Sequence, residues 1–595
     1  MNDMKKFNFK ILGLVALIAI VATSCGLKKM VKKYPNVKYE ILPNQPLETN
    51  GTSDYTQKIN VKVKGTIPPK YFHPKVTVEF VPVLKYDGGT TTLKTLTIVG
   101  QKVKTDVTPV TVISKKTGGT FEYNDVIVYK PEMNKSELVV NPTAKLKKKS
   151  LGLGERKLND GVIYTSTRVG QDEDPSLAEH GYEKETFVTK NGNIYFAYND
   201  AKLNMKLAQN QKPENVTKLK ELTDFISLGL KVKTININAW ASPEGEETIN
   251  QKLTDLRSKT GEKWLKDLYD AAAKEYAKIN KLKNYKATYP VVNLLSKGED
   301  WDGFQKELAA SNIKDKNTIL NVIKSQNDKF KREKTIRDMS VIYKEIEDNI
   351  LSLLRRSEIS YNCYEKKKTD EKIAALSTTY PDSLDVKELL YSATLTNDMD
   401  TKVKIYKSAT SKFANDWKGY NNLGWAYLMK KDYTNALVSL EKANTLNPNN
   451  GMILNNLGVA NSWKGNFVDA MNFYKQAESK GVNTTYNQGV LLIRQGDYSG
   501  AITNFTGKSC RYNIGLAQLL ALKYTEASST LECGPKTADA YYLLAVIGAR
   551  TNNTSMMYDY LKKACQADAK FKVQAKDDRE FLKYATSGDF TNAIQ

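Results

Sequence analysis

The feature that most constrains how this chain folds is a repeated pattern of small residues in its C-terminal part. Gly424 and Ala436 recur as Gly458 and Ala470, each 34 residues later. Two helices of a hairpin pack closely where both present a small residue, and the larger residues around them fill the seam to the next hairpin. The pattern therefore predicts a stack of helical hairpins, which weaker copies extend over residues 386–595.

The unit at residues 417–450 resembles the tetratricopeptide repeat. Besides the two small residues, these positions fit that unit: Tyr420, Leu423, Tyr427, Leu440, Ala443 and Pro448. The resemblance implies an α-helical solenoid whose concave groove binds a peptide segment or a domain of a partner protein. Asparagines recur on the expected first helices of two successive hairpins: Asn421, Asn422, Asn455 and Asn456. Their side-chain amides either hold a ligand in the groove or form a polar face in contact with solvent.

Residues 1–25 have the composition of an export signal. Lys5 and Lys6 precede an apolar stretch that ends at Val21, and small residues follow up to Cys25. The apolar stretch is about half as long as a membrane-spanning helix requires, which disfavours a retained transmembrane anchor. Its end resembles a lipobox, in which the cysteine takes a diacylglycerol, so we expect lipidation at Cys25. The alternative is a plain secretory signal with an incidental cysteine.

Acyl chains on Cys25 would hold the mature chain on a membrane, because each buried methylene contributes about 0.8 kcal/mol. Lysines that suit anionic headgroups follow at once: Lys28, Lys29, Lys32 and Lys33. Some envelope lipoproteins carry an acidic run at this place, which directs them to the cell surface. We therefore expect an outer-membrane lipoprotein that faces the periplasm.

A β-rich domain is expected over residues 26–180. Residues 58–64 alternate polar and apolar side chains with the period of a half-buried strand. Residues 76–81 and 95–99 repeat the alternation, and two short strands are expected at residues 121–123 and 126–129. Short strands at this spacing predict a β-sandwich, with the immunoglobulin-like fold as one form, and no catalytic chemistry is evident in it.

The pattern changes near Gly192. A strand at residues 194–198 is followed by an amphipathic helix at 214–228, an alternating strand at 232–240 and a long helix that reaches about residue 277. This order predicts a small sheet with helices on one face, and we bound this α/β domain at residues 185–367.

These residues resemble the OmpA-like domain, which binds peptidoglycan in many envelope proteins. The resemblance rests on aromatic residues in the first strand and on the signature of the long helix: Tyr195, Phe196, Tyr198, Asn250, Leu253, Thr254, Arg257, Ser258 and Leu265. It implies a site for the diamino acid of a peptidoglycan stem peptide. The family holds the ammonium of that residue with an Asp, but Ser242 stands at this position, and Glu244 is the acid two residues later.

The chemistry of such a site follows from the residue types. An Arg guanidinium holds a carboxylate through two N–H groups, which suits Arg257, and the N–H groups of a helix start add to the attraction. Asn250, near the helix start, can order the loop. The alternatives are a purely structural OmpA-like module and, for Arg257 alone, a surface ion pair with Asp255 or Glu262.

The segment after the long helix departs from a minimal OmpA-like domain. A helical insert is expected over about residues 270–354, followed by a closing strand at 356–364 and a linker at 368–385. The linker contains Asp382-Ser383-Leu384, which is similar to an O-glycosylation acceptor at Ser383.

The expected periplasmic location is oxidising, so cysteines of this chain can form disulfide bonds. Cys510 and Cys533 lie 23 residues apart on either side of a turn near Lys523, at the open end of one expected hairpin. They form either a disulfide or two buried thiols.

Other classes of function are disfavoured. The formal net charge is +23, but the basic residues are mixed with acids and no nucleic-acid-binding motif accompanies them. Only two histidines are present, and phosphate loops, nucleophile elbows and metal-ligand spacings are not found, so we expect no catalytic residues, metal or cofactor.

The chain is thus expected to be multidomain: an N-terminal β-sandwich, a central α/β OmpA-like domain with a helical insert, and a C-terminal α-helical tetratricopeptide solenoid. The expected function is a non-catalytic outer-membrane lipoprotein scaffold, which binds peptidoglycan and an envelope protein in the solenoid groove. The alternative is an accessory subunit of an outer-membrane protein assembly or secretion complex, without peptidoglycan binding.

Overall fold

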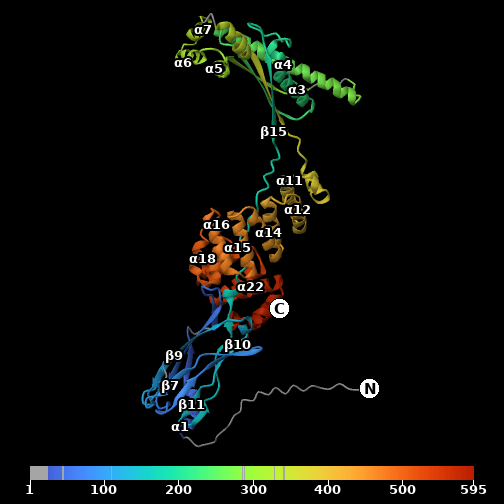
Figure 1. The fold of residues 1–595 in the computed structure, drawn as a ribbon. Coiled ribbons are helices and arrows are strands. Elements are labelled where there is room, and N and C mark those ends of the chain that lie inside the picture. Colours follow the sequence, from blue (N-terminus) through green and yellow to red (C-terminus); the bar gives the residue numbers. More distant parts are fainter. Residues whose placement is uncertain are drawn as a thin grey trace, which may run out of the picture. The chain divides into compact units, whose positions relative to one another are not determined.

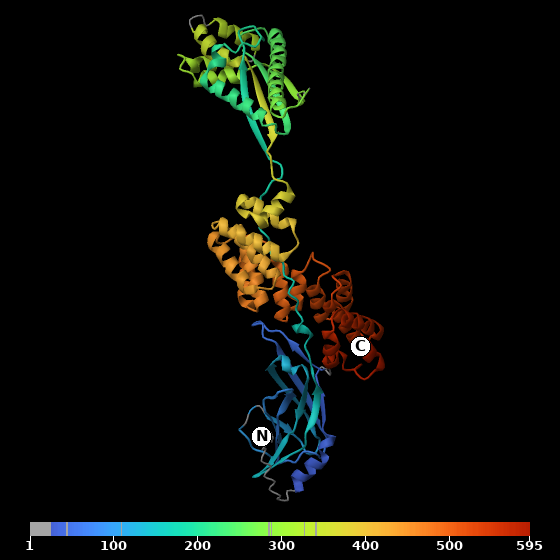
Figure 2. The same ribbon diagram turned by 90° about the vertical axis from the view of Figure 1, so that its right-hand side faces the viewer.

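The computed structural model describes residues 25–42, 46–106, 108, 110–283, 286, 288–326, 328–338 and 342–595. The predicted export signal up to residue 24 and the side chain of Cys25 lie outside these described parts. The chain forms two compact units, which are described separately. The first combines Met1–His180 with Pro381–Gln595, and the second is Gly181–Tyr380 (Figures 1 and 2).

The N-terminal part of the first unit is β-rich, as expected. It contains helix α1 (Cys25–Lys33), the short helices η1 (Tyr34–Asn36), η2 (Pro131–Asn134) and η3 (Thr165–Thr167), and these strands: β1 (Lys38–Ile41), β2 (Leu47–Asn50), β3 (Lys58–Ile67), β4 (Thr77–Phe80), β5 (Pro82–Tyr86), β6 (Gly89–Thr92), β7 (Leu96–Gly100), β8 (Val110–Ile113), β9 (Gly119–Val128), β10 (Ser136–Val140), β11 (Thr143–Leu146), β12 (Lys149–Gly152), β13 (Arg156–Asp160) and β14 (Val162–Ile163).

The described strands form three sheets rather than the two of a simple sandwich. Their orders are β1-β3-β2-β14 with β9 paired to β3, β13-β10-β5-β6, and β12-β11-β4-β7-β8. One hydrophobic core lies between them, from Leu27 to Val162. Only Val81 separates β4 from β5, and only two residues separate β10 from β11, so one antiparallel strand pair passes from one sheet into the next.

The two short strands expected at residues 121–123 and 126–129 are one strand, β9, which pairs with β3 over its whole length. Asp125, which lies between the two expected strands, is buried and accepts hydrogen bonds from the backbone N–H of Lys94 at 2.8 Å and from the Tyr123 hydroxyl at 3.2 Å. A buried carboxylate with such donors remains within a strand, because its lone pairs are satisfied.

The C-terminal part of the first unit is an array of helical hairpins, which confirms the predicted repeats. Its helices are α11 (Val386–Ser392), α12 (Met399–Lys412), α13 (Trp417–Met429), α14 (Tyr433–Leu446), α15 (Gly451–Lys464), α16 (Phe467–Ser479), α17 (Thr485–Arg494), α18 (Tyr498–Asn504), α19 (Tyr512–Leu520), α20 (Tyr524–Cys533), α21 (Ala538–Arg550), α22 (Thr554–Ala567), α23 (Lys570–Asp577) and α24 (Gly588–Ala593), with the short helices η5 (Pro381–Ser383), η6 (Ala393–Leu395) and η7 (Arg579–Phe581).

The second unit is a mixed sheet of order β15-β18-β16-β17 with helices packed on it. Its strands are β15 (Phe187–Tyr195), β16 (Val232–Ala241), β17 (Val292–Glu299) and β18 (Arg356–Tyr364). Its helices are α2 (Ala208–Gln211), α3 (Pro213–Ser227), α4 (Glu247–Ile279), α5 (Trp301–Ala310), α6 (Lys316–Ser325), α7 (Lys329–Asp338), α8 (Tyr343–Ile346), the π-helical η4 (Glu347–Leu351), α9 (Ser352–Leu354) and α10 (Asp370–Thr379).

Two predicted boundaries need correction. The expected insert at 270–354 includes β17, which pairs with β16 in parallel, so the separate helical cluster begins only at Trp301. The expected linker at 368–385 contains α10, which Thr369 caps and in which Ile373 is buried. The expected end of the β-rich segment is residue 180, and the first segment of the first unit ends at His180.

The close packing of the repeats can be tested at Gly458. A Cβ atom there would lie 2.5 Å from the ring of Tyr474 on the second helix of the same hairpin. We expect Gly458→Ala to lower the unfolding free energy of the first unit by about 1–3 kcal/mol in urea denaturation, because the helices must separate. Gly588→Ala is the matched control, since a Cβ there meets nothing within 4 Å. Equal stability of the two variants would contradict this account of the hairpin.

Candidate functional site

The groove of the array is occupied by the chain's own segment. Residues 168–178, here called the strap, leave the β-rich domain and run in extended form along the first helices of the hairpins (Figures 1 and 2). On four of these helices an asparagine stands two residues before the small glycine of the repeat. These four residues, the asparagine ladder, are Asn422, Asn456, Asn487 and Asn513.

Each asparagine of the ladder holds one strap residue by its main chain. The side-chain oxygen accepts from the strap N–H and the side-chain NH₂ donates to the strap carbonyl. The distances are 2.9 and 2.9 Å for Asn513 with Gly170, 2.8 and 3.3 Å for Asn487 with Asp174, 2.7 and 2.7 Å for Asn456 with Ser176, and 2.7 and 3.0 Å for Asn422 with Ala178.

This pattern resembles one edge of a β-ladder, in which alternate residues exchange both main-chain bonds with a partner. Asn421 and Asn455, one residue earlier in their repeats, donate further bonds to the carbonyls of Ser176 and Asp174 at 3.2 and 2.8 Å. All six amides are buried. They form neither a solvated face nor a site for a separate partner, because they satisfy the main chain of the strap.

Three consecutive acids of the strap contact polar side chains of the array, Glu173 in a buried position and Asp174 in an exposed one. Asp172 accepts from the Tyr486 hydroxyl at 2.7 Å, and Asp174 accepts from Arg511 at 2.8 Å. Glu173 is almost fully buried and accepts from Ser462 and from the Trp463 indole. These contacts depend on side chains, so they add sequence selectivity to the main-chain contacts of the ladder.

Burial raises the pKa of the Glu173 carboxyl, and the bonds from Ser462 and Trp463 only partly oppose this effect. The pKa of Asp172 is raised for the same reason. Arg511 supplies compensating charge, and its guanidinium lies 3.5 Å from the centre of the Tyr486 ring. The residue before Arg511 is Cys510, which a disulfide joins to Cys533, so the bridge ties the strap-binding loop to helix α20.

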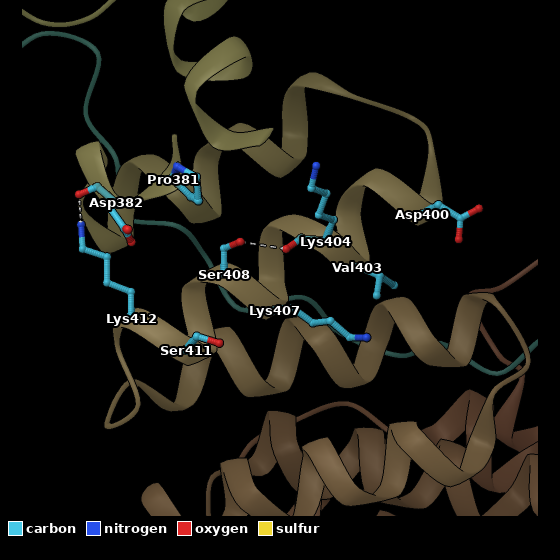
Figure 3. Close-up of a pocket in the computed structure, with 9 residues that line it drawn as sticks. All are labelled: Pro381, Asp382, Asp400, Val403, Lys404, Lys407, Ser408, Ser411 and Lys412. Atoms are coloured by element: carbon cyan, nitrogen blue, oxygen red, sulfur yellow. Dashed lines mark hydrogen bonds between the residues drawn. The ribbon is translucent and has the colours of Figure 1, made fainter. Parts of the chain in front are cut away.

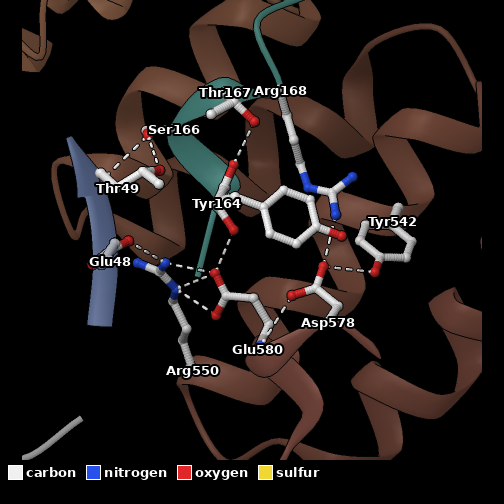
Figure 4. Close-up of polar contacts among 11 residues, drawn as sticks. Glu48, Thr49, Tyr164, Ser166, Thr167, Arg168, Tyr542, Arg550, Asp578 and Glu580 are labelled. Atoms are coloured by element: carbon white, nitrogen blue, oxygen red, sulfur yellow. Dashed lines mark hydrogen bonds and ion pairs between the residues drawn. The ribbon is translucent and has the colours of Figure 1, made fainter. Parts of the chain in front are cut away.

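A second polar cluster ties the start of the strap to the C-terminal end of the array (Figure 4). Arg168 donates to Asp578 at 2.7 Å, and Tyr542 donates to the same carboxylate at 2.8 Å. Arg550 bridges the buried Glu580 and Glu48 of strand β2, at 2.6 and 2.7 Å. The β-rich domain and the array are therefore joined at both the strap and its origin.

The four residues predicted to bind peptidoglycan come together in the second unit. Ser242, Glu244, Asn250 and Arg257 line one cavity of about 180 Å³. Arg257 is 1% exposed and donates to the carbonyls of Asp200 at 3.0 Å and Trp240 at 2.9 Å. It is thus no surface ion pair: Asp255 pairs with Lys259 and Glu262 with Lys266.

The charges in this cavity are already partly compensated. Glu244 Oε1 accepts from Arg355 at 2.8 Å and from Ser242 at 2.5 Å, and Asn250 donates to the Ser242 carbonyl at 3.2 Å. Glu244 Oε2 is buried and has no hydrogen-bond partner among the described residues. Burial lowers the pKa of Arg257 to about 10, with Arg355 adding to the effect, so Arg257 is still a cation at neutral pH. Sequence reasoning missed Arg355, which lies 113 residues after Ser242.

Another opening, a cleft of about 610 Å³, lies along the exposed face of α12 (Figure 3). Lys412 donates to the carbonyls of Asp382 and Leu384, at 2.5 and 2.7 Å, and so closes one end of it. Three lysines and two aspartates line the cleft, so its charge is mixed and we assign it no ligand. Ser383, the predicted glycosylation acceptor, is exposed beside it on η5.

None of the helices in the described parts of the chain is both long and apolar enough to cross a membrane. Within the same residues, no cluster of three or more His, Cys, Asp or Glu side chains could hold a metal ion.

Comparison with known proteins identifies the repeats. Residues 417–450 match the tetratricopeptide repeat family. No curated protein matches the chain as a relative. Among solved structures, a tetratricopeptide repeat protein from Parabacteroides merdae is 17% identical, covering 36% of this chain and 91% of its own, with a TM-score of 0.29.

PilW, described as a widely conserved type IV pilus biogenesis factor, is 13% identical over 39% of this chain and 100% of its own, with a TM-score of 0.26. The C-terminal part of a repeat protein from Cytophaga hutchinsonii is 14% identical over 35% of this chain and 98% of its own, with a TM-score of 0.24. Likeness of this degree carries no argument about function. The C-terminal region is a tetratricopeptide array, a class of protein-interaction scaffold.

The asparagine ladder can be tested at Asn456. Replacement by Ala removes both bonds to Ser176, which leaves its N–H without a partner and its carbonyl with only the bond from Asn421, so we expect Asn456→Ala to lower the unfolding free energy of the first unit by about 1–3 kcal/mol. Hydrogen exchange followed by mass spectrometry should show faster exchange of the strap amides. Asn472→Ala, at an exposed position on α16, is the control and should leave exchange unchanged. Unaltered strap exchange in Asn456→Ala would refute the ladder.

The raised pKa of Glu173 predicts a pH dependence. The folded state binds this proton more readily than the unfolded state, so the contribution of Glu173 to stability is greatest below its unfolded pKa and declines as the pH rises through its folded pKa. Between about pH 4 and pH 7, the melting temperature of the wild type should therefore fall relative to that of Glu173→Gln. Glu441→Gln, at an exposed glutamate of α14, should melt in parallel with the wild type throughout.

Proposed function

We propose that this protein is a non-catalytic scaffold of the cell envelope, anchored in the outer membrane through lipid on Cys25. The observation that carries the proposal is the strap in the groove. Six buried amides and the contacts of three strap acids with side chains of the helices join the β-rich domain to the array. A tetratricopeptide groove filled in this way is part of the framework of the molecule.

The partner protein then has to bind outside the filled groove. The strap is tethered at both ends to folded parts of the chain, so its effective concentration in the groove is very high compared with a free peptide. A competing peptide would have to replace all the main-chain bonds of the ladder. The outer surface of the helices is the better candidate, and two of its large side chains are Val438 and Val468, which are 62% and 58% exposed.

We further propose that the second unit is the OmpA-like domain and that its cavity binds the diamino acid of peptidoglycan. Two observations support this: the residues of the family motif line one cavity, and the unpaired Oε2 of Glu244 can accept from an ammonium. Arg257 donates to three carbonyls, those of Asp200, Trp240 and Ala197, and the two N–H groups that remain on its terminal nitrogens can hold a carboxylate.

A second candidate is an accessory subunit of an outer-membrane assembly or secretion complex, without peptidoglycan binding. The observation that favours it is the burial of Arg257 and the pairing of Glu244 with Arg355. In this case both charges serve the stability of the fold, and the partner protein determines the function.

Sedimentation of residues 26–595 with purified peptidoglycan separates the two candidates. Ile249 lies on the rim of the cavity and is 46% exposed, so Ile249→Trp should fill the opening and abolish retention while the protein stays folded. Val216→Trp, at a 45% exposed position on α3, is the matched control and should be retained like the wild type. A folded wild type that stays in the supernatant would exclude the peptidoglycan site and favour the accessory subunit.

A further inference from the structure

Helix α4 extends far beyond the core it packs on. Its last buried side chain is Leu265. The last side chain of α4 that packs against the core is Tyr269, which is only partly buried. From Asp270 to Ile279 no side chain is buried, and this stretch adds about 15 Å at the usual rise of a helix. Figure 1 shows this end of α4, in green, projecting from its unit.

The projecting helix has a defined end. Lys281 adopts a left-handed conformation with φ of 54°, and the N–H of Leu282 donates to the carbonyl of Ala277 at 2.9 Å. This is the hydrogen bond of a Schellman motif, which folds the following residue back against the last turn. Leu282 is therefore placed at the tip of the helix rather than in a free loop.

The tip combines apolar and basic side chains. Tyr276, Ile279 and Leu282 are 51%, 70% and 45% exposed. Four lysines surround them, Lys274, Lys278, Lys281 and Lys283, and Glu275 is the only acid in residues 274–283, so the tip has a net charge of +3. Large apolar side chains that stay in water beside lysines indicate a contact surface rather than a solvated helix end.

We propose that the tip of α4, residues 274–283, binds the surface of an anionic lipid bilayer. The three apolar side chains would enter the boundary between headgroups and acyl chains, while the lysines reach the phosphates. Tyrosine is favoured at the membrane–water interface, because its ring is apolar and its hydroxyl is polar. The tip suits an anionic bilayer in shape and in charge, because it is a protruding, cationic helix end with apolar side chains at its centre.

An acidic groove on a protein fits the tip less well. A helix that lies in such a groove presents anchors at i, i+3 or i+4, and i+7. Toward the core, the positions that would continue the row from Tyr276 are Ala272 and Ala273, which offer almost no apolar surface. This row of apolar side chains is too short to fill a groove on a partner protein, but it is long enough for the end of a helix that enters the surface of a bilayer.

Co-sedimentation with vesicles tests the proposal on residues 26–595, where no acyl anchor contributes. With about a quarter phosphatidylglycerol in phosphatidylcholine, the wild type should bind, and it should bind much less to phosphatidylcholine alone. Ile279→Ser with Leu282→Ser, and separately Lys278→Glu with Lys283→Glu, should each lower the partition coefficient about tenfold. Circular dichroism and the melting temperature confirm that both variants fold.

Matched controls use exposed residues elsewhere. Leu522→Ser with Val573→Ser changes two exposed apolar side chains of the array, and Lys218→Glu with Lys220→Glu changes two exposed lysines of α3. Both should bind like the wild type. Tip variants that bind like the wild type, or equal binding to neutral vesicles, would overturn the proposal. The outcome does not depend on retention by peptidoglycan, because the cavity at Ser242 is unchanged in every variant.

Discussion

The first unit depends on the ability of one asparagine side chain to satisfy both main-chain groups of another residue. A buried N–H and C=O without partners cost free energy, so an extended segment is rarely buried outside a sheet. The ladder of Asn422, Asn456, Asn487 and Asn513 supplies the missing partners from helices. The strap can therefore be buried along the array without a neighbouring strand, and the β-rich domain is joined to the repeats as a result.

This arrangement changes what the repeats do in this chain. A tetratricopeptide groove is a binding surface, and here the ligand is covalently part of the same molecule. Side-chain contacts of Asp172, Glu173 and Asp174 define which segment binds. The ion pairs of Arg168 with Asp578 and of Arg550 with Glu580 hold its origin. Binding in cis avoids the loss of translational freedom that a separate partner would incur.

The second unit buries charge for a different purpose. Arg257, Glu244 and Arg355 meet at the end of the sheet, where β16 gives way to helix α4. A charged side chain is buried at low cost only when hydrogen bonds satisfy it, which the carbonyls of Asp200 and Trp240 do for Arg257. The same groups that stabilise the turn line the cavity, so stability and binding share residues there.

The amino-acid sequence by itself determined the elements with a strong local signal. The repeats followed from Gly424, Ala436 and their copies, and strand β3 from its alternation, because these patterns report packing within a few residues. The strap, Arg355 and the single strand β9 could not be predicted, since each is defined by partners more than 30 residues away: Asn513 for Gly170, Ser242 for Arg355 and Lys94 for Asp125. Tertiary structure alone decided that the groove is filled, because a polar segment such as the strap has no periodic apolar pattern and is ordered only by the main-chain hydrogen bonds that the folded array offers.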